Sequence, residues 1–471
     1  MFFLSGLYTR ATTIVRLACG ILVRVDGSPE INQIEPSRLN SGLEQFRVLR
    51  VLFVISQDSG GGAARAVHRI YRSLRENFSD VCDVRMRVIH KFHDDDRIVG
   101  GKATRNRKEY FEYFVRTRFR KYFPRRPFVS DNTLLHSQAL YHSGLGRELN
   151  QAYKDVIMLG WLGNSTLSIP EIGRLRGPVV WRLSDMWMFS GAEHYTKNDR
   201  YRVGYSRKSR PDSESGPDID RETFRRKNRH WKYPRHVIAP SKWMAEQVKA
   251  SQLTRKWLVH VIPNPIDCDY WAPIDRGVAR AKMVLPPDAI VILFGTGGGL
   301  KHHHKGGDLL LASLSSIEKR LTEMGNKSRV ICAIFGEETP AEIVSGIEVV
   351  YLGRLNDEEL KAAYSAANVM VVPSRLDNLP STAVEAQACG TPVVAFRVGG
   401  LPDIVDDSVS GTIVEPFDVV GLGRAIAEIA GDRKKAEIMG AAARERAIGL
   451  WSPRVIAGQY LEVLELAASE G

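Results

Sequence analysis

The sequence predicts two consecutive α/β units, each built on a doubly wound parallel sheet, that face one another across a cleft. Short apolar runs alternate with amphipathic stretches from residue 47 onward, and the alternation starts again near residue 288. Such runs are typical of parallel strands that helices cover on both faces. The 471 residues also exceed what one core usually supports. A ligand is therefore expected in the crevice at the carboxyl ends of the strands, between the two units.

The first unit is predicted over residues 47–262, with a strongly amphipathic helix at residues 63–77. Two long, polar and basic stretches, residues 91–130 and 196–232, break its alternation. Loops of this length in a compact protein are usually functional or mobile. The strands are expected within residues 47–56, 80–89, 154–161, 177–183 and 235–241.

The second unit is predicted over residues 263–450, after a hinge near residues 261–271 where two prolines break the periodicity. Helices are expected at residues 308–321 and 357–368. The strands are expected within residues 288–298, 328–337, 347–353, 369–374, 391–396 and 411–416.

Composition and cysteine spacing indicate a globular protein of a reducing compartment. Apolar residues make up 44% and charged residues 25% of the chain. The five cysteines stand far apart, unlike those of a zinc site or a disulfide framework. A cytoplasmic protein without a metal site is therefore expected.

The N-terminal extension, residues 1–46, is apolar at its start, but Arg10, Arg16 and Arg24 interrupt the apolar region. No stretch reaches the roughly 18 uncharged residues of a membrane span, and no small-residue cleavage site follows, which disfavours a secretory signal. An amphipathic helix lying on a membrane surface remains an alternative.

The formal net charge of +12 is concentrated in two segments. Residues 101–126 contain ten Lys or Arg, two Glu and seven aromatic residues, and residues 197–235 contain thirteen basic and six acidic residues. A solvated face, nucleic acid and an anionic membrane each fit such segments. No recognition helix or aromatic strand motif accompanies them, so peripheral contact with the inner face of a membrane is expected rather than contact with nucleic acid.

The stretch "SRLDNLPSTAVEAQACGTPVV", residues 374–394, places Asp377 at a strand exit and Glu385 in the first turns of a helix. The amides from Asn378 to Thr382 would point out at the helix N-terminus, where a phosphate or sugar hydroxyl is readily held. The carboxylate of Glu385 could accept both hydroxyls of a ribose. Two structural explanations remain: Thr382-x-x-Glu385 has capping-box spacing, and Asp377 can form an Asx-turn.

Two glycine-rich loops each join a strand to a helix. The loop "GTGGGLKHHHKGGDLLL", residues 295–311, contains Gly298, and its residues Lys301 and Lys305 could neutralise a diphosphate. It has neither a Walker motif nor a complete dinucleotide fingerprint. Its three adjacent histidines have no carboxylate at ligand spacing, which disfavours a metal. In the first unit, residues 60–62 would let a substrate lie against the backbone, or they form only a tight turn.

Several of these segments resemble the group 1 glycosyltransferases, retaining enzymes of GT-B fold that use nucleotide-sugar donors. The resemblance covers residues 47 to about 450 and rests on motifs in the family's order, above all "VIPNPID", "VVYLGRLNDEELKAAYSAANVMVVPSRLDNLPS" and "GTPVVAFRVGGLPDIV". It implies two Rossmann-like domains, the donor bound by the second, and a C-terminal helix, residues 451–471, that packs back on the first.

The family's pattern of two acidic residues with seven residues between them reads Asp377 and Glu385 here. The resemblance therefore implies that Glu385 takes the donor ribose. It also implies that Asp377 and the segment after it contact the donor sugar, through Asn378, Leu379 and Ser381.

The resemblance assigns the diphosphate to Lys305. Lys301 and Gly298 of the same loop would assist, although the family usually has an arginine in a shorter loop here. Gly61 and Gly62 of the first unit would lie near the donor phosphate and the acceptor.

The chain departs from the resembling subgroup at two positions. The subgroup commonly has His before the Trp and His before the Asp, whereas this chain has Gly160 before Trp161 and Ser184 before Asp185. The second histidine contacts the donor sugar in the family, so either the activity or the donor is expected to differ. Asp185 and His194 remain as polar groups that could orient an acceptor.

The reaction expected is transfer of a hexose from a nucleotide diphosphate sugar to an acceptor hydroxyl, with retention and without a metal or cofactor. Asp377, Lys305 and Asp185 would carry the catalysis. The expected acceptor is a polyprenyl-linked or polysaccharide precursor glycan. Two alternatives remain open: a sugar-nucleotide epimerase of the same fold, and a non-catalytic sugar-nucleotide-binding or scaffold protein.

Overall fold

The computed structural model describes residues 13–16, 22–25, 48–100, 128–130, 132, 135–140, 142–163, 166–233, 235–295, 303–339 and 341–470. Residues 1–47 and residues 48–471 form separate compact units. In the N-terminal unit, β1 (Thr13–Arg16) and β2 (Leu22–Val25) pair as antiparallel strands. The amphipathic helix that the sequence allowed is therefore wrong for these residues.

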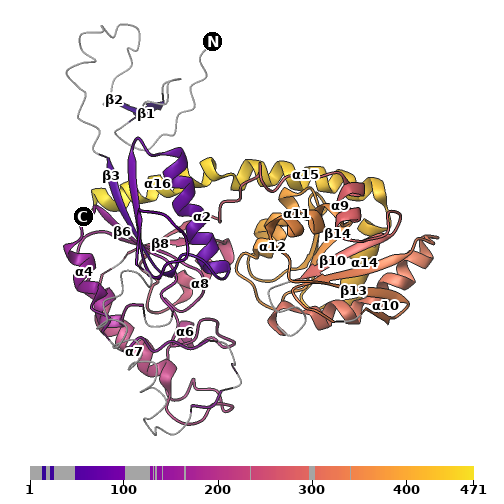
Figure 1. Ribbon diagram of the computed structural model, residues 1–471. Helices are drawn as coiled ribbons and strands as arrows, with labels where there is room; N and C mark the ends of the chain where they lie inside the picture. Colours follow the sequence, from indigo (N-terminus) through magenta and orange to yellow (C-terminus); the bar gives the residue numbers. More distant parts are fainter. Residues whose placement is uncertain are drawn as a thin grey trace, which may run out of the picture. The chain divides into compact units, whose positions relative to one another are not determined.

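The first large sheet has seven parallel strands in the order β5-β4-β3-β6-β7-β8-β9 (Figure 1). The chain begins in the middle at β3, builds outward to β5, and then returns to build from β6 to β9. This is the doubly wound order, and its switch point lies between β3 and β6. The strands are β3 (Leu49–Gln57), β4 (Cys82–His90), β5 (Ile98–Val99), β6 (Val156–Leu159), β7 (Val179–Arg182), β8 (His236–Ala239) and β9 (Leu258–Val261).

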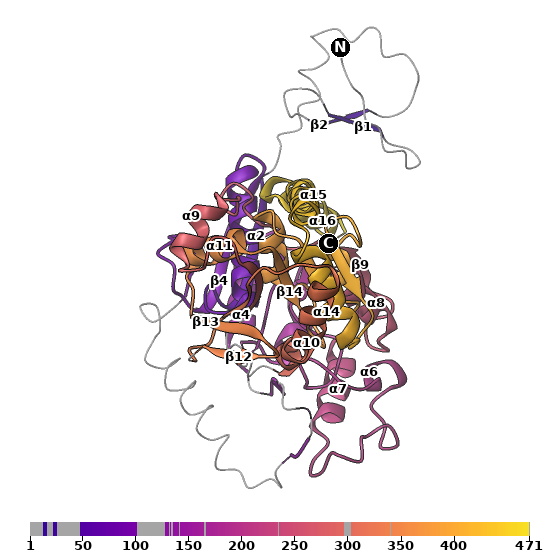
Figure 2. The same ribbon diagram turned by 90° about the vertical axis from the view of Figure 1, so that its right-hand side faces the viewer.

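The second large sheet repeats this order as β12-β13-β11-β10-β14-β15-β16, with its switch point between β10 and β14. All its pairs are parallel except that β12 runs antiparallel to β13 at one edge (Figure 2). The strands are β10 (Ile290–Gly295), β11 (Val330–Phe335), β12 (Glu342–Val344), β13 (Ile347–Gly353), β14 (Val369–Val372), β15 (Val393–Phe396) and β16 (Gly411–Val414).

Helices cover both faces of each sheet, and each face has its own hydrophobic core. All residues of β6 and β14 are buried, which explains their uninterrupted apolar sequences. The helices of the first sheet are α2 (Gly62–Asn77), α4 (Leu145–Gln151), α5 (Ile169–Gly173), α6 (Arg200–Val203), α7 (Ile219–His230) and α8 (Lys242–Ala250). Those that follow are α9 (Arg276–Lys282), α10 (Gly307–Glu323), α11 (Asp357–Ala366), α12 (Ser381–Ala388), α13 (Leu401–Ile404), α14 (Val419–Ala430), α15 (Arg433–Trp451) and α16 (Pro453–Ser469).

The last helix returns to the first sheet. α16 packs beside α2 (Figure 1), and its Ile456, Tyr460 and Leu464 belong to the same buried cluster as Phe53 of β3. Helix α16 thus follows the strands of the second sheet in the chain but buries its apolar face against the first sheet. Among the described residues, no helix has the length and apolar character needed to cross a membrane.

The segment 196–232, expected as a loop, contains α6 and α7 and is partly interior. Arg200 is buried against Asp218, whose carboxylate accepts from its guanidinium at 2.6 Å. Lys227 is fully buried and donates to the backbone carbonyls of Ser190 and Gly191. These two cations therefore serve internal packing and do not belong to a solvated basic face. The other basic segment, residues 101–126, lies outside the described residues.

A buried carboxyl group in this segment should make stability depend on pH. Burial, with help from neighbouring Glu193, raises the pKa of Asp220 to about 8. The folded state then holds a proton that the unfolded state releases near pH 4, so this group's stabilisation is complete below pH 4 and is lost as pH rises to about 8. Between pH 5 and 7, wild type should lose about 1 kcal/mol per pH unit relative to Asp220→Asn, whose amide cannot titrate. Urea unfolding of both proteins measures the difference, and equal slopes would contradict the prediction.

Candidate functional site

The loops at the switch point of the second sheet bring two sequence-predicted residues together. Lys305 follows β10 at the end of a short 3₁₀ turn, His303–Lys305, and Asp377 follows β14. The Nζ of Lys305 donates to the Oδ2 of Asp377 at 2.6 Å, and Ser374 Oγ lies 3.4 Å from the same oxygen. Asp377 thus uses its side chain for an ion pair with the other loop. Both side chains are mostly buried, so the pair stands where the fold predicts a ligand.

A second contact fixes the two loops to each other. Arg375 donates to both carboxylate oxygens of Asp308, at 2.7 and 2.6 Å, and to the carbonyl of His303. Gly306 has a positive φ of 73°, and a Cβ there would lie 1.8 Å from the carbonyl oxygen of Pro373. The glycine is therefore needed for the close approach that positions Lys305. Lys301 and Gly298 lie outside the described residues.

Glu385 lies in α12 and is only 2% exposed. Its Oε1 accepts from the guanidinium of Arg69 at 2.9 Å, and its Oε2 accepts from the hydroxyl of Tyr364 at 3.2 Å. Burial, followed by the Glu385 charge, raises the pKa of Tyr364 well above its usual value. Each carboxylate oxygen keeps a second lone pair. The carboxylate is thus oriented by two donors, and neither of its oxygens uses its full acceptor capacity.

Helix α12 does not use a capping box. It begins at Ser381 with Pro380 in the N-cap position and has no side-chain cap, so the Thr382-x-x-Glu385 explanation is wrong. Leu379 turns its side chain into the hydrophobic core. No described residue accepts a hydrogen bond from the backbone N–H groups of Asn378 and Leu379. These donors remain for a ligand at the helix N-terminus.

The glycine pair in "RVGGLPDIV" supports this loop from behind. Gly400 donates its N–H to the carbonyl of Asp377 at 3.1 Å. A Cβ on Gly399 would lie 1.7 Å from the Asp377 carbonyl oxygen, and one on Gly400 would lie 1.8 Å from that of Asn378. Only glycine allows this approach, so the pair fixes the backbone that carries Asp377 and Asn378.

In the first sheet, Asp185 follows β7 and accepts three hydrogen bonds. The indole N–H of Trp161 reaches its Oδ2 at 2.9 Å, the backbone N–H of Trp187 reaches its Oδ1 at 3.0 Å, and His194 Nδ1 lies 2.5 Å from Oδ2. His194 Nε2 is bonded to Ser137 Oγ at 2.9 Å. Both nitrogens of His194 are therefore occupied, and the imidazole holds Asp185 in place.

The two positions that lack the subgroup's histidines have structural explanations. A Cβ on Gly160 would come within 3.1 Å of Val67, so a histidine there would require its neighbours to move. Ser184 Oγ accepts from Arg182 at 2.6 Å. Arg182, Ser184 and Asp185 line a pocket with room for about one water. The guanidinium of Arg182 thus takes up space beside Ser184.

Tyr195 of the first half lies within electrostatic reach of Asp377 in the second. Its hydroxyl donates to the Ser184 carbonyl at 3.3 Å. Its pKa is raised well above the usual value, first by burial and then by the carboxylates of Asp377 and Asp185. The phenol therefore lies near the acidic residue of each half. Sequence reasoning did not identify Tyr195, Arg69 or Tyr364, because no local motif contains them and their contacts are set by the assembled fold.

The first glycine loop lies at the other switch point. Gly61 precedes α2 and has a φ of 114°, a backbone conformation that only glycine adopts freely. Added Cβ atoms at Gly61 and Gly62 would meet nothing within 4 Å, so the space beside them is open. Asp58 accepts from the N–H groups of Phe92 and His93 and so anchors the loop to the end of β4.

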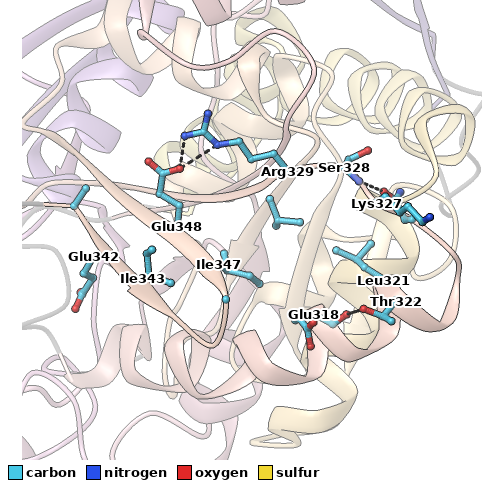
Figure 3. A pocket seen from close by; sticks show the side chains of 14 residues that line it. Glu318, Leu321, Thr322, Lys327, Ser328, Arg329, Glu342, Ile343, Ile347 and Glu348 are labelled. Carbon is cyan, nitrogen blue, oxygen red and sulfur yellow. Dashed lines mark hydrogen bonds and ion pairs between the residues drawn. The ribbon is translucent and has the colours of Figure 1, made fainter.

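Another pocket, of about 710 Å³, lies in the second sheet, at the ends of the strands opposite to Lys305 and Asp377 (Figure 3). Arg329 and Glu348, which both line it, form an ion pair at 2.5 Å. Its walls include Val330 and Ile347, which begin β11 and β13. It is therefore at the amino ends of the strands, away from Lys305 and Asp377. No group of three or more potential metal-ligating side chains occurs among the described residues.

Two doubly wound sheets with an acidic pair and a lysine at the second switch point define a GT-B-like fold. Solved structures agree: sucrose-phosphate synthase from Thermosynechococcus elongatus has a TM-score of 0.61 at 19% identity, over 90% of this chain and 100% of that one. HepE of Anabaena, solved in complex with UDP-glucose, has a TM-score of 0.56 at 17% identity, over 89% of this chain and 100% of that one.

Residues 281–446, all in the second half of the chain, match the model of the family "Glycosyl transferases group 1". D-inositol 3-phosphate glycosyltransferase of Saccharomonospora viridis is 34% identical over 218 residues, which is 42% of this chain and 49% of that protein. D-inositol 3-phosphate glycosyltransferase 1 of Catenulispora acidiphila is 32% identical over 233 residues, which is 46% of this chain and 54% of that protein. The chain thus spans about half the length of these curated relatives.

Proposed function

We propose that this protein transfers a hexose from a nucleotide diphosphate sugar to an acceptor hydroxyl with retention of configuration. The observation that carries the proposal is the position of Lys305, Asp377 and Glu385. All three lie at the carboxyl-end switch point of a sheet within the matched family region, residues 281–446. In a nucleotide diphosphate sugar the diphosphate lies between the ribose and the sugar, so a donor would use a cation for the diphosphate and one hydroxyl acceptor for each of the other two groups.

The Lys305–Asp377 pair suggests how a donor would bind. The diphosphate would take the lysine, and Asp377 would then accept hydroxyls of the donor sugar in its place. One internal ion pair is exchanged for two substrate contacts, so neither charge is left without a partner. The residues of 263–450 would form the donor side, with the N–H groups of Asn378 and Leu379 and the start of α12 at Ser381 beside the sugar.

The residues of 47–262 would form the acceptor side. Asp185 is held by three donors and keeps acceptor capacity for an incoming hydroxyl. The open space beside Gly61 and Gly62 would admit the acceptor near the donor phosphates. The leaving diphosphate would take the proton, and the chain's own contribution would be positioning and charge stabilisation.

The acceptor is proposed to be a polyprenyl-linked or polysaccharide precursor glycan at a membrane surface. The curated relatives are named D-inositol 3-phosphate glycosyltransferases, so inositol phosphate is a second acceptor to test. The defining experiment is calorimetry with UDP, GDP and ADP and their sugars, followed by a transfer assay in which the product anomer is determined. Absence of any nucleotide binding, or an inverted product, would overturn the proposal.

The basic aromatic segment, residues 101–126, is proposed to contact anionic lipid. Replacing Arg116, Arg118 and Arg120 with alanine should weaken binding to vesicles that contain anionic lipid, because each cation near the surface contributes about 1 kcal/mol. Sedimentation with neutral and anionic vesicles measures this. Unchanged binding of the triple variant would rule out this segment as the contact.

A further inference from the structure

Ser241 is buried where the two halves of the molecule meet. The first half contains the first large sheet, β3 to β9, and the second half contains the second large sheet, β10 to β16. Ser241 is the N-cap of α8 in the first half, and its Oγ accepts the N–H of Met244 at 3.1 Å. Its hydroxyl donates to the side-chain Oδ1 of Asn378, in the second half, at 2.8 Å. Both residues are at most 5% exposed. The serine hydroxyl thus acts as an acceptor within its own helix and as a donor to the opposite loop.

The surrounding contacts make this junction specific. The backbone N–H of Lys242, the first residue of α8, is accepted by Asp403 Oδ2 of the second half at 2.6 Å. Burial raises the pKa of the Asp403 carboxyl. A Cβ on Gly400 would lie 2.7 Å from the Cβ of Ser241. The N-terminus of α8 is therefore clasped by two residues of the second half and fits against a glycine.

The direction of the hydrogen bond determines what Asn378 can offer. Because its Oδ1 accepts from Ser241, its Nδ2 keeps two donors, and no described residue accepts from them. Asn378 directly follows Asp377, which is paired with Lys305. Asn378 thus has two amide donors without a partner among the described residues, directly beside Asp377 in the chain.

We infer that Ser241 is a positioning residue for the donor sugar. It orients the side chain of Asn378 from the opposite half, so the donor sugar is fully recognised only when the two halves are in contact. Binding of the nucleotide alone does not depend on this contact. This inference rests on the proposed function and deepens it. The residue acts through Asn378 and does not itself touch the substrate.

The test compares UDP with UDP-glucose, and in parallel GDP with GDP-mannose and ADP with ADP-glucose, by calorimetry. Ser241→Ala should weaken binding of the matching nucleotide sugar about tenfold, the loss expected for one hydrogen bond, and leave the nucleotide within about twofold. Ser241→Thr keeps the hydroxyl and should restore sugar binding. Ser168→Ala is the matched control, because Ser168 is also a buried N-cap serine but caps α5 within the first half.

Each outcome decides one question. Equal losses for nucleotide and nucleotide sugar, or a loss of the same size in Ser168→Ala, would overturn the positioning role. Asn378→Asp provides a second route, since it keeps the acceptor for Ser241 but removes the amide donors; undiminished sugar binding in it would also overturn the inference. If wild type binds no nucleotide, the proposed donor site itself fails, which is a different result from selective loss in the variants.

Discussion

Replacing Glu385 with alanine should weaken nucleotide binding about 100-fold without unfolding the protein. A ribose would give this carboxylate two hydrogen bonds, each worth about 1.5 kcal/mol or more because the acceptor is charged. Their sum corresponds to roughly two orders of magnitude in the dissociation constant. The side chain is buried and already oriented by Arg69 and Tyr364, so it loses little conformational entropy when the ribose binds. Calorimetry with the nucleotide that wild type binds gives the value.

Two further variants separate ligand binding from effects on the fold. Tyr364→Phe removes one donor to the carboxylate but leaves its charge, and it should change nucleotide affinity only a few-fold. Arg69→Ala removes the partner from the first half and leaves Glu385 in place. If Glu385→Ala melts at a lower temperature but binds nucleotide with wild-type affinity, Glu385 is a structural residue of α12 and not a ribose acceptor.

The fold was predictable because it depends on uniform burial. Strands that are covered on both faces need apolar residues at every position, as in β6 and β14, and this pattern survives in a single sequence. The segment containing α7 was missed for the opposite reason. Its buried face includes Asp220 and Lys227, which pair with buried polar groups, so its helical period is hidden by charge.

The site was predictable only in part. Asp377, Glu385 and Lys305 stand in recognisable motifs, but their partners are set by the assembled fold: Arg69 lies 316 positions from Glu385 and Ser241 lies 137 positions from Asn378. Local spacing also misled at Thr382. A capping box requires its first residue at the N-cap, and α12 begins one residue earlier, after Pro380. Contacts between the two halves therefore carry information that no local pattern contains.

Replacing Lys305 with methionine should lower kcat about 10²- to 10³-fold, the usual cost of removing one donor that stabilises developing charge. Methionine keeps most of the side-chain volume, so the loop after β10 should keep its shape. Negative charge on the diphosphate grows as the bond to the sugar breaks, so the ammonium stabilises the transition state more than the bound donor. The loss should therefore fall on kcat more than on the binding of nucleotide sugar.

Arg375→Ala is the matched control for Lys305→Met, since it removes another cation of the same two loops. Arg375 pairs with Asp308 and the His303 carbonyl, so its loss should lower thermal stability with a smaller effect on kcat. Lys305→Met also leaves Asp377 without its ion-pair partner. If the role of the lysine is purely structural, the variant should show weaker donor binding together with reduced stability. A variant that loses binding and stability but keeps kcat at saturation would assign Lys305 to loop architecture. A fall in kcat at nearly unchanged donor affinity would assign it to the leaving diphosphate.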